Sequence, residues 1–236
     1  MSAKLKSSLV IVLVALTLPF LMPLFNFRIL VFNLGFYQQG FERHHVYYLF
    51  PDRQQVDDAA VELIGYLANK SDLTTDFFNE KEKGHLVDVK DLIRTTLLAF
   101  KALLIISIVS LTYLAVTKRY RAIGYSFVLG GLTSLASFVG IALLVQRQFF
   151  SLFLQFHFIA FDNELWMLDP RTDNLIRMFP AGFFYDTVQR IARNSVVAAV
   201  LFVVFGVVLV LSTSLIVRSH AVEPVEKAAG DSAERA

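Results

Sequence analysis

Four apolar stretches, each about 20 residues long, constrain the fold of this chain more than any other feature. Residues 7–25, 122–145 and 195–217 contain no charged side chain, and residues 95–116 contain one, Lys101. A helix of about 20 mostly apolar residues is long enough to cross the hydrocarbon core of a bilayer. The sequence therefore predicts an all-α integral membrane protein built as a four-transmembrane-helix bundle.

The composition excludes several other classes of protein. Apolar residues make up 56% of the chain, charged residues make up 18%, and the formal net charge is +2. A disordered chain has lower hydrophobicity and a nucleic-acid-binding protein has an unbalanced basic surface, so neither class fits and no nucleic acid is expected as a partner. The chain has no cysteine, which excludes disulfides, thiolate nucleophiles and zinc–sulfur sites. No phosphate-binding loop, haem ligand or metal cluster is recognisable, so neither a cofactor nor a metal is predicted.

Basic residues predict how the helices cross the membrane. They gather before the first stretch and between the second and third, at Lys4, Lys6, Lys118, Arg119 and Arg121. Because Lys and Arg are enriched in cytoplasmic segments, both termini are predicted to be cytoplasmic (N-in/C-in). The first stretch also resembles a signal peptide, but no small-residue cleavage site comes after it, so it is predicted to be an uncleaved anchor.

These assignments predict the domain organisation of the chain. In chain order the parts are 1–25, the N-terminus and first helix; 26–94, an extracellular cap segment; 95–145, the second and third helices with the basic cytoplasmic turn 117–121; 146–194, a second extracellular cap segment; 195–217, the fourth helix; and 218–236, a disordered cytoplasmic tail.

The two long connections are predicted to form one small extracellular cap of short helices and a β-hairpin. Eleven aromatic residues lie in 26–94 and eleven more in 146–194, about two thirds of the total. Apolar residues at helical spacing between Val56 and Leu67 predict an amphipathic helix. The turn 169–173, between two short extended segments, predicts the hairpin. A further helix is predicted to run from Phe184 into the fourth stretch.

Five histidines are the candidates for chemistry. His220 lies in the predicted tail, and the adjacent His44 and His45 are either a surface pair or a contact to a metal or substrate. His85 immediately precedes the second helix, which is predicted to begin near residue 86, with Asp88 suited to the N-terminal helix dipole. His157 comes after the third stretch.

The outer ends of the second and third helices are predicted to be neighbours, because sequential helices are antiparallel. His85 and His157 can then meet in an aromatic setting at the outer edge of the membrane. If the third helix continues outward, Phe150, Phe153 and Leu154 share the face of His157, as does Phe161. Imidazole is the side chain best suited to moving protons near neutral pH. The residues alone leave two interpretations open, two unrelated interfacial histidines or a catalytic pair.

A long motif resembles that of the lipoprotein intramolecular transacylase family, Lit. Its parts are Phe156-His157-Phe158-Ile159-Ala160-Phe161-Asp162-Asn163, Trp166, Leu168-Asp169-Pro170-Arg171-Thr172-Asp173-Asn174-Leu175-Ile176, Met178-Phe179-Pro180 and Phe183-Phe184. The shorter segment His85-x-x-Asp88-Val89-Lys90 is also similar to that family. The resemblance covers roughly residues 7–217 and the four-span layout.

The resemblance implies a membrane acyltransferase whose catalytic residues match His85 and His157. The implied reaction moves the sn-2 acyl chain of a diacylglyceryl-modified lipoprotein to the α-amino group of its N-terminal cysteine, giving a lyso-form lipoprotein. The implied location is the bacterial cytoplasmic (plasma) membrane, in contact with membrane lipids, with the active site at the outer leaflet. The substrate-orienting candidates are Lys90, Phe153, Phe161, Asn163 and Trp166.

Two other functions stay open on the sequence. One is a non-enzymatic membrane sensor or scaffold whose cap binds a lipid or a partner. The other is an intermolecular acyltransferase or a lipase, but Ser151 lies off the helical face of His157 and is a poor nucleophile candidate. Neither alternative accounts for the long motif.

Overall fold

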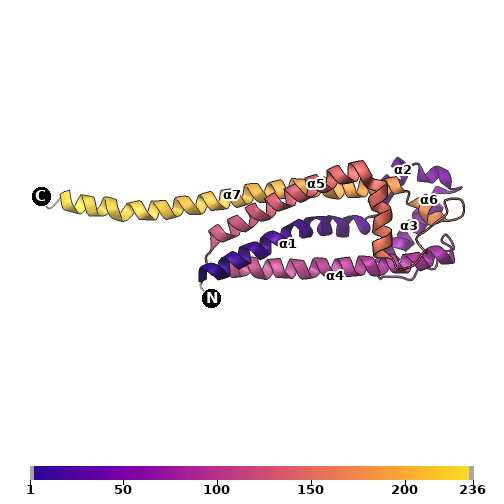
Figure 1. Ribbon diagram of the computed structural model, residues 1–236, viewed down its shortest axis with the longest axis horizontal. Coiled ribbons are helices and arrows are strands. Elements are labelled where there is room, and N and C mark those ends of the chain that lie inside the picture. The colour runs from indigo at the N-terminus through magenta and orange to yellow at the C-terminus, as the bar shows by residue number, and fades with distance from the viewer. Residues whose placement is uncertain (1–2, 234–236) are drawn as a thin grey trace. The chain divides into compact units, whose positions relative to one another are not determined.

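The computed structural model describes residues 3–233 of the chain, with side chains over residues 5–215. In chain order the elements are α1 (Ala3–Val31), α2 (Leu34–Arg43), the 3₁₀ turn η1 (Val46–Leu49), α3 (Arg53–Leu67), α4 (Glu80–Val116), α5 (Tyr120–Ala160), α6 (Asn174–Met178) and α7 (Ala181–Ala233), as drawn in Figure 1. The tail predicted to be disordered, 218–236, falls on residues whose side chains lie outside the described part, and its disorder stays a prediction.

The predicted all-helical layout with four apolar membrane-spanning helices is confirmed. Among the described residues, Leu5–Val31, Glu80–Val116, Tyr120–Ala160 and Ala181–Leu215 are long and apolar enough to cross a membrane. The predicted amphipathic helix in the first cap segment is α3, which buries the side chains of its apolar stripe. The helix predicted from Phe184 is the first part of α7, which continues without a break into the fourth apolar stretch.

The predicted β-hairpin is wrong, since the described part of the chain contains no strand. The turn itself exists, because the amide N–H of Asp173 donates to the carbonyl oxygen of Asp169 at 2.8 Å. The residues after it form α6 instead of a strand. Asp173 is the extended N-cap residue of α6, and the carboxylate of Glu82 accepts the N–H of Leu175. That bond satisfies a first-turn amide that has no partner within a helix.

The chain divides into two compact units. The first comprises residues 1–20, 103–137 and 196–236, and the second comprises residues 21–102 and 138–195. The four long helices each contribute to both units, whereas α2, η1, α3 and α6 belong to the second unit alone.

In the first unit, small residues allow helix backbones to approach closely. A Cβ atom added to Gly206 of α7 would lie 2.6 Å from the carbonyl oxygen of Gly124 in α5 and 2.8 Å from the backbone nitrogen of Val128. Hydroxyl groups join another pair of helices, since the Oγ atoms of Thr17 in α1 and Ser107 in α4 lie 2.6 Å apart. Close backbone contact and interhelical hydrogen bonds are the forces that associate helices in lipid, where apolar side chains gain little from burial.

Gly206→Ala is expected to destabilise the first unit, because backbone atoms occupy the space of the new methyl group. Overpacking of this kind costs about 1–3 kcal/mol. Gly140→Ala is the matched control, because a Cβ atom added to Gly140 meets nothing within 4 Å. Both substitutions replace glycine by alanine inside a helix, so both gain the same helix propensity. Thermal unfolding in detergent should show a lower midpoint for Gly206→Ala only. Equal midpoints would contradict the close contact of α5 and α7.

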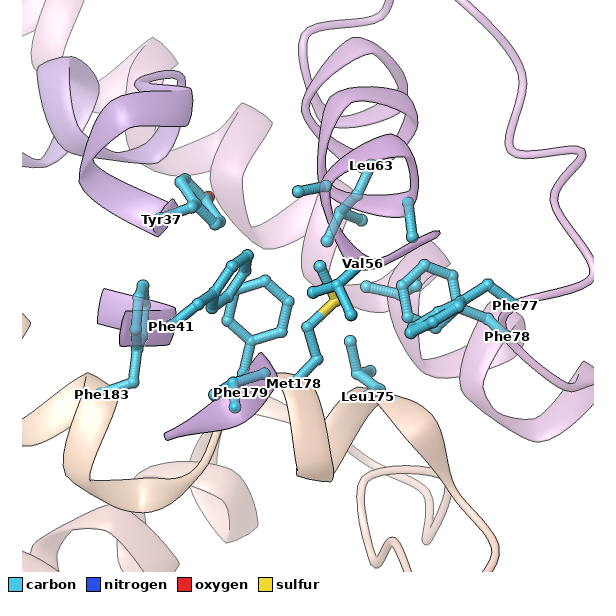
Figure 2. Packing of buried hydrophobic residues seen from close by; sticks show 14 of the residues in the cluster. Tyr37, Phe41, Val56, Leu63, Phe77, Phe78, Leu175, Met178, Phe179 and Phe183 are labelled. Carbon is cyan, nitrogen blue, oxygen red and sulfur yellow. The ribbon is translucent and has the colours of Figure 1, made fainter. Parts of the chain in front are cut away.

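In the second unit, aromatic side chains form the core (Figure 2). Tyr37 and Phe41 of α2 pack against Phe179 at ring-centroid distances of 5.5 Å each, and Phe183 of α7 completes the cluster. Burial raises the pKa of Tyr37, and its hydroxyl donates to the carbonyl oxygen of Val31 at 2.8 Å. This core holds α2, α3, α6 and the start of α7 together, and therefore fixes where the loop before α6 ends.

Candidate functional site

The first histidine is positioned by the start of α4, which begins at Glu80, earlier than the predicted start near residue 86. The reason is a capping box: Asn79 Oδ1 accepts the amide N–H of Glu82 at 3.0 Å, and Glu82 Oε2 accepts the N–H of Asn79 at 2.7 Å. His85 therefore lies inside the helix, one turn after Glu82. Asp88 lies too far from the helix start for the predicted dipole interaction, whose effect falls off within the first turn.

The second histidine is positioned by a kink in α5. Gln148 has non-helical dihedral angles, φ −135° and ψ 25°, and the helix changes direction there (Figure 1). His157 lies on the short arm beyond the kink. Its ring contacts Phe153, one turn earlier, at a centroid distance of 4.5 Å. Phe150 and Leu154, which the helical spacing predicts on this face, are instead 71% and 50% exposed.

The structure brings His85 and His157 together, and their predicted meeting in an aromatic setting is confirmed. Their ring centroids lie 6.4 Å apart. Phe161 packs edge-on against His85 at 4.9 Å, and Trp166 lies 4.9 Å from His157. Together with Phe153, these residues form the histidine site. The side chain of His85 is buried, with 7% of the residue exposed.

Hydrogen bonding distinguishes the two imidazoles. His157 Nδ1 lies 2.6 Å from the carbonyl oxygen of Phe153. Since a carbonyl oxygen can only accept, Nδ1 carries the proton, and Nε2 of the neutral ring has a free lone pair. Nδ1 of His85 is buried and has no hydrogen-bond partner within the described residues. A buried polar atom without a partner is rare in native proteins.

Asn163 and Lys90, predicted to orient the substrate, are engaged with other residues. Asn163 Nδ2 donates to Asp88 Oδ2 at 2.9 Å, and Asn163 Oδ1 accepts the amide N–H of Leu165. The ammonium group of Lys90 lies 3.9 Å from the ring centroid of Tyr66 in α3. The structure thus brings Phe153, Phe161 and Trp166 to the two histidines but directs the polar groups of Asn163 and Lys90 elsewhere.

The other histidines lie apart from this site. His44 Nε2 lies 3.1 Å from Asp186 Oδ2, with 21% of the histidine side chain exposed. His45 is in the left-handed conformation, with φ 56°, before η1. In the part of the chain that the structure describes, no group of three or more His, Asp or Glu residues is arranged to hold a metal ion. The side chain of His220 is outside that part.

Sequence reasoning missed one residue of this region, Glu82. Its side chain is almost completely buried, with 1% of the residue exposed, although glutamate is rarely buried without a partner. The signal that could have revealed it is the spacing Asn79-x-x-Glu82 ahead of an apolar helix, which is the pattern of a capping box.

Comparisons with known proteins find a matching family model and solved structures of similar fold. The family model of the lipoprotein intramolecular transacylase Lit matches residues 11–184. A search of curated proteins gives no match. A crystal form of the membrane integral Lit from Bacillus cereus superposes with a TM-score of 0.78 at 20% identity, covering 89% of this chain and 98% of that chain.

Two variants of the Bacillus cereus protein, each with a histidine replaced, are also similar. The variant with arginine gives a TM-score of 0.74, with 20% identity over 89% of this chain and 94% of that one. The variant with alanine gives 0.73, with 20% identity over 89% and 96%. At this identity the structures show a shared fold, and the family model supplies the relationship in sequence.

Proposed function

This chain belongs to the Lit family of lipoprotein intramolecular transacylases, and from that premise we propose that it moves the sn-2 acyl chain of a diacylglyceryl lipoprotein to the α-amino group of the same lipoprotein's N-terminal cysteine. Because members of this family are acyltransferases, this chain is an acyltransferase. The observation that carries the finer proposal is the pair of imidazoles, 6.4 Å apart and surrounded by aromatic rings.

The reaction needs a base, an acid and no further reactant. The amine nitrogen attacks the carbonyl carbon of the sn-2 ester, a carbon–nitrogen bond forms, and the bond from that carbon to the glycerol oxygen breaks. The amine loses a proton and the departing oxygen gains one, so atoms and charge balance within one substrate molecule. The substrate supplies its own nucleophile, so no serine or cysteine nucleophile is required of the enzyme.

We infer that His157 is the base and that His85 stabilises the oxyanion. Because Nδ1 of His157 donates to the carbonyl oxygen of Phe153, Nε2 is the atom that accepts the proton of the amine. The ring of His85 lies beside that of His157 and would donate a hydrogen bond to the oxyanion, while the protonated His157 would return its proton to the departing oxygen. The buried, unpartnered Nδ1 of His85 supports a role for that ring in binding the substrate.

The aromatic residues would supply orientation. A ring of eight atoms closes when the amine meets the ester carbon, through Cα, Cβ, sulfur, two glycerol carbons and the ester oxygen. Rings of this size close slowly in free solution, so holding the two ends together would supply part of the acceleration. We propose that Phe153, Phe161 and Trp166 fold the lipid in this way, whereas Asn163 and Lys90 act through their contacts to Asp88 and Tyr66.

The proposed location is the bacterial cytoplasmic membrane, with both termini in the cytoplasm and the site at the outer leaflet. Lys118 and Arg119, between α4 and α5, and Arg121, in the first turn of α5, support this orientation, because such residues are retained on the cytoplasmic side. The proposed partners are diacylglyceryl-modified lipoproteins and the surrounding membrane lipids.

Mass spectrometry of a reporter lipoprotein tests the proposed function. The host lacks its own N-acylating enzymes and expresses the full chain. The expected result is an acyl chain moved from glycerol to nitrogen at unchanged lipopeptide mass. A gain of one acyl mass would indicate an intermolecular enzyme with a phospholipid donor. An unchanged lipopeptide, with the chain present in the membrane, would favour the sensor or scaffold.

A further inference from the structure

One loop packs an aromatic ring against each of the two histidines. We call residues 161–173, between α5 and α6, the strap. At its start Phe161 contacts His85, and in its middle Trp166 contacts His157, with ring-centroid distances of 4.9 Å in both cases. The position of the strap therefore determines how both imidazoles are held.

The strap is fastened to the first three turns of α4 by polar contacts. In order along the strap they are Asn163 to Asp88, the carbonyl oxygen of Met167 to the ammonium of Lys81, Asp173 to Asn79, and the amide of Leu175, just past the strap, to Glu82. The backbone of α4 also lies close to the strap, since a Cβ atom added to Gly84 would lie 3.0 Å from Leu165 Cδ1. The helix that carries His85 is thus also the support of the strap.

Glu82 is the most deeply buried of the residues that make these contacts. One carboxylate oxygen accepts the N–H of Asn79 within the capping box, and the other accepts the N–H of Leu175, 93 residues away in the chain. A capping box needs only the first of these bonds. A hydrogen bond is stronger in a buried setting than in water, and a buried acceptor that loses its donor is costly. The second bond therefore joins the start of α4 to the end of the strap.

A second buried carboxylate completes this junction. Asp173, 4% exposed, accepts a hydrogen bond from Asn79 Nδ2 at 2.9 Å and another from the amide of Asp169 at 2.8 Å. Burial raises the pKa of Asp173, but the hydrogen bonds from Asp169, Thr172 and Asn79 lower it further, to below its usual range. The carboxylate stays ionised and its oxygens are occupied by donors, which holds the strap end in a single arrangement.

We propose that Glu82 is a positioning residue for acyl transfer, which fastens the strap to α4 and so sets the alignment of His157 and Trp166 with His85. This role rests on the proposed acyl transfer at the histidine site. The hydrogen bonds of the Glu82 carboxylate go to Asn79 and Leu175 and to neither histidine ring. Its effect passes through the strap, so its loss alters the chemical step in a protein that still binds its substrate.

Glu82→Gln is the variant that tests this role. The side chain keeps its size and can still accept one backbone N–H, but its new NH₂ group faces the other donor. Because a displacement of about 1 Å can cost about 100-fold in rate, kcat per folded enzyme is expected to fall about 10- to 100-fold with KM unchanged. Glu80→Gln is the matched control, since Glu80 lies on the same turn with its side chain 94% exposed, and both constants should stay within about twofold.

If Glu82→Gln does not fold, a second variant tests whether the contact between α4 and the strap positions the site. Asn79→Ser keeps a side-chain oxygen for the helix cap and leaves Glu82 in place, but it removes the bond to Asp173. It is expected to lower kcat less than Glu82→Gln does, again without a change in KM. Folded fraction is measured by thermal unfolding in detergent, and the rate by conversion of a diacylglyceryl lipopeptide to its lyso-form.

The possible outcomes separate this role from the proposed function. If the unmodified chain does not convert the lipopeptide, the proposed function fails and not merely the role of Glu82. If the unmodified chain is active, an unchanged kcat per folded molecule in both variants would show that the capping box only stabilises the helix. A raised KM at constant kcat would likewise overturn the positioning role.

Discussion

His157→Asn is expected to lower kcat for acyl transfer by about 10²- to 10⁴-fold, the usual contribution of a general base. The amide nitrogen of asparagine takes the place of Nδ1 and can still donate to the carbonyl oxygen of Phe153, so the local hydrogen bond at this point of α5 is preserved. The variant lacks the basic lone pair that Nε2 presents. The loss should therefore appear in the chemical step, while the variant keeps the folded structure and the substrate affinity of the unmodified chain.

The matched control is His44→Gln, another partly buried histidine with a hydrogen-bonded ring, whose partner is Asp186. Transfer should proceed in this control at nearly the normal rate. The measurement is lipopeptide conversion by purified protein, with thermal unfolding recorded for each variant. If His157→Asn retained transfer, the imidazole pair would not be the catalytic group. If the two substitutions slowed transfer equally, general instability would be the better explanation.

Phe41→Ala is expected to have the largest effect on stability. Phe41 is fully buried, and its ring packs against Tyr37, Tyr47, Phe179 and Phe183. Removing a buried phenylalanine typically costs about 3–5 kcal/mol, because the surrounding side chains close the cavity only in part. The second unit should unfold at lower temperature, and transfer should be lost although both histidines are intact.

Tyr48→Ala is the control for Phe41→Ala, since Tyr48 lies in the same part of the second unit but is 85% exposed. Its free energy of unfolding should be within about 0.5 kcal/mol of that of the unmodified chain. Unfolding is followed in detergent by near-ultraviolet circular dichroism, which reports on aromatic packing. Equal stability of Phe41→Ala and the unmodified chain would contradict the packing of this core.

Much of the fold and the central pair of the site could be predicted from the sequence. The four spans are evident from runs of apolar residues whose length matches a bilayer. The meeting of His85 and His157 is a consequence of antiparallel neighbouring helices, each with a histidine near its outer end. The amphipathic helix α3 is evident from the spacing of its apolar residues. These features depend on local periodicity and on chain connection, which are visible in sequence.

The remaining features depend on contacts between distant residues. The turn 169–173 could be located from the sequence, but the helical conformation of the next residues depends on Glu82, about 90 residues earlier, whose carboxylate accepts an amide of α6. The kink at Gln148 has neither glycine nor proline beside it to mark it in the sequence. Helical spacing predicts the face on which Lys90 lies, but not that Tyr66 of α3 lies opposite.

The central claim is that the transferred chain stays within one lipoprotein molecule, and an isotope crossover experiment tests it most directly. Two diacylglyceryl lipopeptides of different sequence, one with a deuterated sn-2 chain, are mixed with the purified protein, and the products are analysed by mass spectrometry. Intramolecular transfer predicts that every deuterated chain is found on the nitrogen of its original peptide. Deuterated chains on the nitrogen of the other peptide would contradict the account.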